Sequence, residues 1–199
     1  MNKRSLVFLI VVLNVGLLLS CLQVQARSWE IDEDHTNLYF SVDHIYSKVQ
    51  GRFTNYKGTL IFDPANLKDS KIAFEIKVKS IDTGIGKRDR HLRSADFLEE
   101  SKYPLITFTS RSITEAGENM YNVSGILTIK DVSRELVLPL RFEGVRENPL
   151  APELEVAGFN GRLTLDRLEF NVGDGKYYKM GAVGKDVDIL VTIEALRKK

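Results

Sequence analysis

The sequence contains one cysteine, Cys21, among its 199 residues. With no second cysteine to pair with it, an intramolecular disulfide is excluded, and the fold must be held by buried apolar surface and hydrogen bonds. An excess of charge of one sign is also missing, because 28 basic side chains stand against 27 acidic ones. Proteins that bind nucleic acid need a basic surface for the phosphates, so this balance argues against nucleic acid as a partner.

Internal repeats, linkers and low-complexity tracts are missing too. We therefore expect one folded domain, covering residues 27–199. Helical periodicity is confined to one short segment, residues 88–100, which we expect to form a helix, and to a turn near residues 166–170.

Only the N-terminus carries a long apolar run. Lys3 and Arg4 precede it, the run extends from residue 6 to residue 19, and Val24-Gln25-Ala26 follows as a small-residue cleavage site. This is the layout of a secretory signal peptide, and the run is too short for a stable membrane span. We therefore expect residues 1–26 to be a signal peptide and the mature protein to be periplasmic or secreted.

A second signal overlaps the first. Leu18-Leu19-Ser20-Cys21 resembles a bacterial lipobox, in which the cysteine becomes the lipidated first residue of a membrane-anchored lipoprotein. Alternatively, Cys21 simply lies within the cleaved peptide. Both interpretations place the folded domain outside the cytoplasm.

The rest of the chain alternates apolar and polar residues with a period of two, the pattern of half-buried strands. Turn-rich segments separate most of the alternating segments, for example at residues 116–119 and 130–131. Several strands reach about ten residues, or about 33 Å, and strands of this length coil strongly. An all-β fold is therefore expected: an eight-stranded antiparallel barrel, with the short helix near one end, is favoured over a two-sheet sandwich. The strands are expected around residues 38–43, 58–62, 72–79, 106–108, 121–129, 136–142, 159–165 and 187–193.

The apolar side of these strands faces the barrel interior, where it lines either a tunnel or a packed core. Three glycines, Gly58, Gly125 and Gly161, share its parity; each widens the bore by lacking a side chain or permits a bulge or a sharp coil. Because the glycines occur together with six inward phenylalanines, we predict a lipid-binding tunnel. Its predicted lining residues are Phe40, Val42, Phe62, Phe74, Ile76, Phe108, Gly125, Leu127, Leu138, Phe142, Phe159, Gly161 and Leu163.

The stretch GIGKRDRHLRSADF, residues 84–97, holds most of the ingredients of an active site. A hydrolase would use Ser94 as nucleophile, His91 as base, and Asp89 or Asp96 to orient the base. Ser94 nevertheless lacks a Gly-x-Ser-x-Gly elbow and an evident oxyanion loop. We therefore expect no catalytic residues, and a protein that is not an enzyme.

Metal and cofactor sites are not expected either. His35 and His44 are nine residues apart on what is predicted to be one strand, which separates them by about 30 Å. The pair Gly84-x-Gly86 lacks the third glycine of a dinucleotide-binding loop.

Several motifs resemble the YceI-like family, and together they span nearly all of residues 28–196. The most specific is Arg88-Asp89-x-His91-Leu92-Arg93-Ser94-x-Asp96-Phe97. The others include Gly58-x-Leu60-x-Phe62-Asp63, Tyr103-Pro104-x-Ile106-x-Phe108, Gly125-x-Leu127-Thr128 and Asp166-Arg167-x-x-Phe170. The resemblance implies an extended, lipocalin-like barrel that binds a polyisoprenoid or a similar long-chain amphiphile, usually in the periplasm.

Two residues depart from the family pattern. Asp131 and Asn171 stand where the family often has glycine. Asp and Asn tolerate left-handed backbone conformations better than most residues, so we expect the turns to persist.

An amphiphile with an anionic head needs a cationic group near the mouth of its tunnel. Guanidinium groups match phosphate geometry bidentately, so we predict that Arg88, His91 and Arg93 contact the head group. Leu92 and Phe97 are expected to pack this segment over one end of the barrel.

Taken with the resemblance, the sequence predicts a protein that binds a long-chain lipid or isoprenoid in the barrel interior, for transport or storage in the bacterial envelope. No cofactor other than this ligand is expected; the partners considered are the lipid, a membrane surface and a second copy in a homodimer. Two alternatives stay open: an envelope hydrolase that uses His91 and Ser94, and a structural, stress-related envelope protein with a packed interior and no ligand.

Overall fold

The computed structural model describes residues 28–199. The predicted signal peptide and the lipidation site proposed at Cys21 lie outside the described residues, so both stay predictions. No helix among residues 28–199 combines the length and the apolar composition that a membrane crossing requires.

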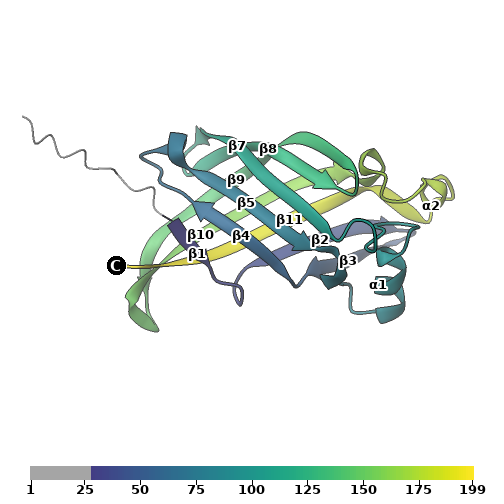
Figure 1. The fold of residues 1–199 in the computed structure, drawn as a ribbon, viewed down its shortest axis with the longest axis horizontal. Coiled ribbons are helices and arrows are strands. Elements are labelled where there is room, and N and C mark those ends of the chain that lie inside the picture. The colour runs from purple at the N-terminus through teal and green to yellow at the C-terminus, as the bar shows by residue number, and fades with distance from the viewer. Residues whose placement is uncertain (1–27) are drawn as a thin grey trace, which may run out of the picture.

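Strands make up most of the described chain (Figure 1). They are β1 (Ser28–Ile31), β2 (Asn37–His44), β3 (Ser47–Phe53), β4 (Tyr56–Ile61), β5 (Lys71–Lys77), β6 (Ile81–Asp82), β7 (Leu105–Gly117), β8 (Met120–Ile129), β9 (Val132–Asn148), β10 (Ala151–Asp166) and β11 (Val183–Lys198). The helical elements are short: α1 (Gly86–Arg93), α2 (Lys176–Lys179), and the 3-10 turns η1 (Leu67–Asp69), η2 (Val78–Ser80) and η3 (Arg167–Phe170).

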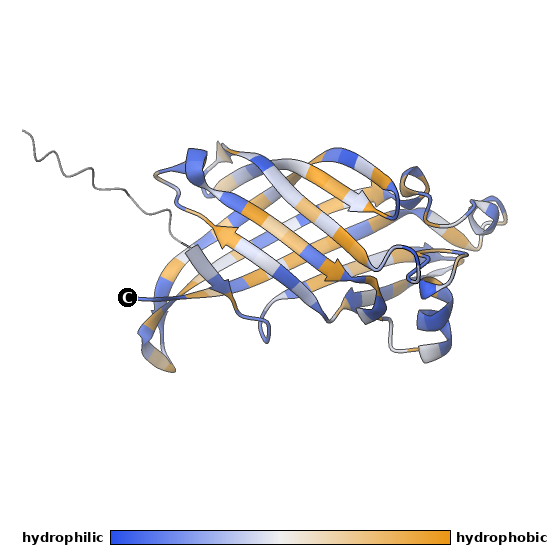
Figure 2. Cartoon of the chain, viewed as in Figure 1, coloured by the Kyte–Doolittle hydropathy of each residue, from blue (hydrophilic) through white to orange (hydrophobic). Residues whose placement is uncertain are grey.

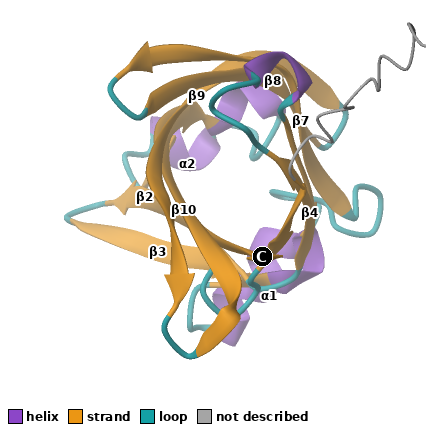
Figure 3. Ribbon diagram, turned by 90° about the vertical axis from the view of Figure 1, so that its left-hand side faces the viewer, coloured by secondary structure: helices purple, strands orange, loops and turns teal. Residues whose placement is uncertain are grey.

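The strands close into one antiparallel barrel. Neighbours in the ring follow the order β1-β4-β5-β7-β8-β9-β10-β11, and β11 pairs back with β1. β2 occupies the same position as β1, because β11 pairs with β1 through residues 195–196 and with β2 through residues 183–192. The ring therefore has eight positions, and the predicted eight-stranded barrel is confirmed. Figure 3 shows the closed ring in end view.

The two helices mark one end of the barrel. α1 and α2 both lie at the end opposite the C-terminus (Figure 1), which we call the helical end. Beyond β2, the strands β3 and β6 extend the sheet. The predicted long strands are present, since β9, β10 and β11 contain 16 or 17 residues each.

The alternation of side chains follows the predicted period of two. On β8, Tyr121, Val123, Gly125 and Leu127 are buried, and the residues between them are partly exposed. Figure 2 shows the corresponding alternation of apolar and polar residues along several strands. Such alternation holds a strand in register, because a slip by one residue would turn its apolar side toward water.

The predicted helix over residues 88–100 is shorter in the structure. α1 ends at Arg93, because Ser94 is extended and its hydroxyl donates to the carbonyl of His91 at 2.8 Å. The backbone N–H of Asp96 donates in turn to the Ser94 hydroxyl, and Glu99 adopts a left-handed conformation with φ 52°. These turns carry the chain away from the helix axis and toward β7.

The two expected turn positions behave differently. Asn171 ends η3 in the left-handed conformation with φ 56°, as its residue type predicts. In the β8–β9 turn, however, Lys130 rather than Asp131 has the positive φ, of 56°. The Lys130 ammonium donates to the carbonyl of Asn171 at 2.9 Å, so it joins the two turns at the helical end.

Three short strands, β1, β3 and β6, were not expected from the sequence. β1 has four residues and supplies only short pairings to β4 and β11. β3 reads SKVQGRF, in which Gly51 replaces an apolar side chain and weakens the alternation. It pairs fully with β2 but meets only two residues of β6 on its other side.

Candidate ligand cavity

The inward face of the barrel changes from packed to partly exposed toward the helical end. On β10, Phe159 is 1% exposed, whereas Leu163 and Leu165, on the same side of the strand, are partly exposed. β2 and β11 repeat the change: Leu38 and Ile193 are buried, and Phe40 and Ile189 are partly exposed. Apolar side chains that point into a barrel and are still partly exposed must border a space that other side chains do not fill.

That space is an apolar cavity of about 230 Å³. Its wall is formed by side chains from both halves of the ring and by the segments that follow α1 and precede β11. All the described residues of the wall are aliphatic or phenylalanine except Tyr39 and Arg167. Engineered apolar cavities of roughly 150 Å³ stay dry and bind benzene, so this volume accommodates part of an apolar chain.

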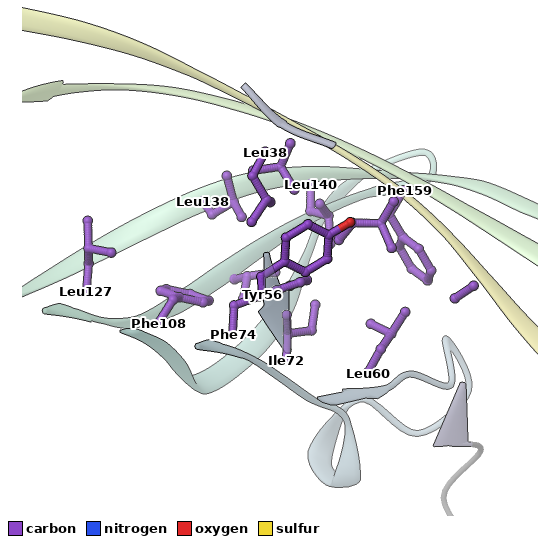
Figure 4. Packing of buried hydrophobic residues seen from close by; sticks show 14 of the residues in the cluster. Leu38, Tyr56, Leu60, Ile72, Phe74, Phe108, Leu127, Leu138, Leu140 and Phe159 are labelled. Atoms are coloured by element: carbon purple, nitrogen blue, oxygen red, sulfur yellow. The ribbon is translucent and has the colours of Figure 1, made fainter. Parts of the chain in front are cut away.

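Eight of the predicted tunnel residues line this cavity. They are Phe40, Val42, Phe74, Ile76, Phe108, Leu127, Leu138 and Leu163. Leu38, Phe74, Phe108, Leu127 and Leu138 are among the side chains of the central cluster shown in Figure 4. The sequence did not single out Phe53, Val187 or Ile189, which also line the wall.

Three predicted tunnel residues lie elsewhere, and this corrects the expected extent of the cavity. Phe62, Phe142 and Phe159 pack against one another, with ring centroids 5.1 Å apart in each pair, and Tyr121 meets Phe62 at 5.0 Å. Tilted and edge-to-face rings at these distances fill the bore. We call this aromatic cluster the packed end of the barrel.

The glycines make room for neighbouring side chains rather than for a ligand. A Cβ at Gly125 would lie 2.7 Å from the ring of Phe108, and one at Gly161 would lie 3.0 Å from Leu138. At Gly58 the corresponding distance to Ile31 is 2.1 Å. Neither Gly125 nor Gly161 lines the cavity, so the interpretation that these glycines widen the bore is replaced by one of close packing.

The basic segment around α1 is held by internal hydrogen bonds. Arg88 donates from Nε to the Thr83 hydroxyl and from Nη2 to the Thr83 carbonyl, both at 2.8 Å. The buried Asp89 accepts hydrogen bonds from the backbone N–H and hydroxyl of Thr83. Arg93 donates to the carbonyl of Lys79 at 3.3 Å, and His91 meets Asp96 at 2.9 Å. Among the described residues, none of the three predicted head-group residues lines the cavity.

Ser94 and His91 do not form a nucleophile–base pair in this arrangement. The Ser94 hydroxyl donates to the backbone carbonyl of His91, and the His91 imidazole is directed to Asp96. A general base must lie within hydrogen-bonding reach of the hydroxyl that it activates. Here the serine terminates a helix, so its local role is conformational.

His35 and His44 are not on one continuous strand, which corrects the sequence argument. Residues 32–36 form a turn between β1 and β2, and His35 lies within it. His35 Nδ1 is 2.7 Å from Asp32, and ligand atoms of Asp32, His35 and Glu194 lie within 4.8 Å of one another. The hydrogen bond to Asp32, followed by its charge, raises the pKa of His35.

At the helical end, aromatic rings close over the barrel interior. Phe97 is buried, stacks on Tyr177 at 5.9 Å and meets His91 edge-on at 5.0 Å. Leu92 and Phe97 both line the cavity, as expected for side chains that pack this segment over the barrel. Tyr177 belongs to α2, so the stack joins α2 to the segment that follows α1. His91 of α1 also meets the Tyr177 ring edge-on, at 6.1 Å, and this contact joins the two helices.

One wall residue of a different chemical kind, Arg167, was not predicted from the sequence. It is 7% exposed and is the only charged side chain among the described residues of the wall. A signal for it was present, because Arg167 has the same parity as the inward residues Phe159, Gly161, Leu163 and Leu165. A charged residue that continues an inward apolar series is a candidate for function.

The fold and the cavity define a class: a closed, eight-stranded antiparallel barrel of lipocalin-like architecture, with an apolar cavity inside it. The chain belongs to the YceI-like family, because the family model described as a YceI-like domain matches residues 29–195.

Relatives and solved structures agree with this assignment. A UPF0312 protein of Pseudomonas syringae pv. tomato is 34% identical over 185 residues, which cover 92% of this chain and 93% of the relative. The crystal structure of BcnA from Burkholderia cenocepacia superposes with a TM-score of 0.74 at 28% identity, covering 83% of this chain and 99% of BcnA. A polyisoprenoid binding domain from Saccharophagus degradans shares the fold with a TM-score of 0.63 at 15% identity, over 84% of this chain and 97% of that domain.

Proposed function

We propose that this protein binds a long-chain amphiphile, a polyisoprenoid or a similar lipid, inside its barrel and carries or stores it in the bacterial envelope. The observation that carries the proposal is the change along the inward face. Phe159 is packed, whereas Leu163, Phe40 and Ile189 border an apolar cavity. A structural protein with no ligand would gain stability by filling this space, since cavities reduce stability in proportion to their volume.

The shape and chemistry of the wall favour a chain-like apolar ligand. The cavity lies between the aromatic cluster of the packed end and the segments around α1 and α2. Burial of apolar surface contributes about 25 cal/mol per Å², so an apolar chain gains free energy along the whole wall. The polyisoprenoid binding domain that shares this fold is consistent with such a ligand.

Transfer of a lipid requires contact with its source, and the helical end is suited to it. Ile45 and Tyr46 at the tip of the β2–β3 hairpin are 62% and 102% exposed, and Met180 is 74% exposed. The hairpin lies next to the segment that follows α2, because the Ile45 N–H donates to the carbonyl of Ala182 at 3.2 Å. Exposed apolar and aromatic side chains favour association with a membrane surface, which we propose occurs at this end.

The experiment that tests the proposal is extraction of the purified protein followed by mass spectrometry of the organic phase. We expect one class of long-chain amphiphile at near-stoichiometric amount. An empty protein that also fails to take up added lipid would contradict the proposal. If the protein were a hydrolase, it would turn over an ester and Ser94→Ala would abolish this turnover. If Ser94 only terminates α1, Ser94→Ala should leave ligand binding unchanged.

A further inference from the structure

Arg167 occupies an unusual position for a charged side chain. It begins η3 directly after β10, it is 7% exposed, and it lies in the wall of an otherwise apolar cavity at the helical end. Burial of an ionised group carries a free-energy penalty of several kcal/mol unless hydrogen bonds and an opposite charge compensate it. The partners of this guanidinium therefore decide what it does.

The protein satisfies only part of the guanidinium. Nε donates to the carbonyl of Gly184 at 2.8 Å, and Nη1 donates to the carbonyl of Val172 at 2.6 Å. Nη2 is buried and has no hydrogen-bond acceptor among the residues that the structure describes. The ring of Phe97 lies 6.0 Å from the guanidinium carbon. The guanidinium fits here because residue 173 is glycine: a Cβ at Gly173 would lie 2.5 Å from Nη1.

Within the described part of the chain, the charge of Arg167 also lacks an ion-pair partner. No carboxylate among residues 28–199 forms a salt bridge with it. Asp166 and Asp174 act on it electrostatically from further away. The Asp166 carboxylate is instead 2.8 Å from the Lys185 ammonium, and this hydrogen bond lowers the pKa of Asp166. Asp166 is thus engaged by another cation.

Arg197 provides the comparison. It too has a buried nitrogen, Nη1, with no acceptor, but its guanidinium pairs with Glu155 and lies 4.0 Å from the ring of Trp29. Arg197 does not line the cavity. The two arginines differ in the missing counter-ion and in the apolar space beside Arg167, and both features point to an anion that enters from that space.

We propose that Arg167 binds the oxyanion head of an amphiphile whose apolar chain fills the cavity. The inference rests on the proposed function and adds the ligand's chemical class: a chain that ends in a carboxylate or a phosphate. Guanidinium groups bind both oxyanions, and such a contact is strengthened when water is excluded from around it. The head group is thereby bound at the cavity wall by Arg167 rather than at the surface by the basic residues of α1.

The test uses three probes with the same chain: dodecanoate, dodecyl phosphate and 1-dodecanol. Their affinities for the delipidated full domain are measured by calorimetry. We expect wild-type protein to bind one or both anions at least about tenfold more tightly than the alcohol, as a charge-assisted contact implies. The ratio between the two anions shows whether a carboxylate or a phosphate is the better head group.

Variants then assign the preference to a residue. Arg167→Met should remove the preference for anions and retain the affinity for 1-dodecanol, whereas Arg197→Met, the matched control, should retain the preference. Arg167→Lys keeps the charge without the planar fork and should retain part of it. If Arg167→Met does not fold, the wild-type ratio and Arg167→Lys decide the question.

Two results would overturn the inference. Equal wild-type affinity for all three probes would show that no cation meets the head group, and equal losses for all three in Arg167→Met would make Arg167 only a support for η3. Failure of wild-type protein to bind any of the three would instead contradict the proposed function itself, and the inference with it.

Discussion

Phe159 and Leu163 point into the barrel from the same side of β10, and only Leu163 borders the cavity. The three residues between them span the boundary between the packed end and the ligand space. This boundary predicts that enlarging a side chain has opposite consequences on its two sides.

On the cavity side, Leu163→Phe should fill ligand space. We expect the amount of co-purified lipid to fall while the free energy of unfolding changes by less than about 1.5 kcal/mol, because the added atoms enter an empty volume. Lipid content by mass spectrometry and chemical denaturation of the same preparation check this. Unchanged lipid content would show that the ligand does not reach Leu163.

Where neighbouring side chains already fill the space, as at Gly125, a larger residue should have the opposite effect: Gly125→Ala should destabilise the barrel. The new Cβ would lie 2.6 Å from the carbonyl oxygen of Thr109 and 2.7 Å from the ring of Phe108. Overpacking of this kind lowers the free energy of unfolding by about 1–3 kcal/mol. The denaturation midpoint gives the answer, and a variant as stable as the wild type would mean that Phe108 moves freely into the cavity.

One substitution in the β2–β3 turn should increase the stability of the protein. Ile45 is a β-branched residue with φ 49°, and its side chain is 62% exposed. A left-handed conformation is unfavourable by about 1–2 kcal/mol for such residues and less so for asparagine. Ile45→Asn should therefore raise the free energy of unfolding, by about 1 kcal/mol. If Ile45 also contacts membranes, the same variant should bind lipid vesicles more weakly than the wild type.

His35 should make the free energy of unfolding depend on pH above its unfolded-state pKa of 6.5. Its hydrogen bond to Asp32 and the charge of that carboxylate raise its pKa from 6.5. Since the folded state holds the proton more tightly, the stabilisation is complete below the unfolded-state pKa and is lost as pH rises through the folded-state pKa. NMR titration of the imidazole should show a pKa above 6.5 that Asp32→Asn lowers. An unchanged pKa in Asp32→Asn would assign the shift to another group.

The sequence-based head-group assignment also has a direct test. Two donors of Arg88 bond to Thr83, so Arg88→Ala should loosen residues 83–94 and weaken binding of farnesyl phosphate and farnesol by similar factors. The assignment of the head group to Arg88, His91 and Arg93 requires instead a loss of about ten- to a hundredfold for the phosphate alone. That result would move the head group from Arg167 to α1.

Much of the fold could be predicted from local sequence patterns. The period-two alternation on strands such as β8 and β11 predicted the barrel, because a strand with one apolar side must turn that side toward a common interior. The turn at Asn171 followed from residue type for the same local reason. β3 was not predicted because Gly51 interrupts its apolar series. This strand forms because it pairs with its neighbour β2, and its own composition does not indicate that pairing.

Parity alone determined which side chains face the interior, and it placed Phe40, Leu163 and Phe159 there correctly. Only the tertiary structure decided which of them meet a ligand space, because a void is the volume that remains after neighbours such as Phe62 and Phe142 have packed around Phe159. The same holds for charge. In the sequence, Arg88 and Arg167 are equivalent cations. The fold gives Arg88 a surface partner in Thr83, whereas it buries Arg167 in the cavity wall with no salt-bridge partner among residues 28–199.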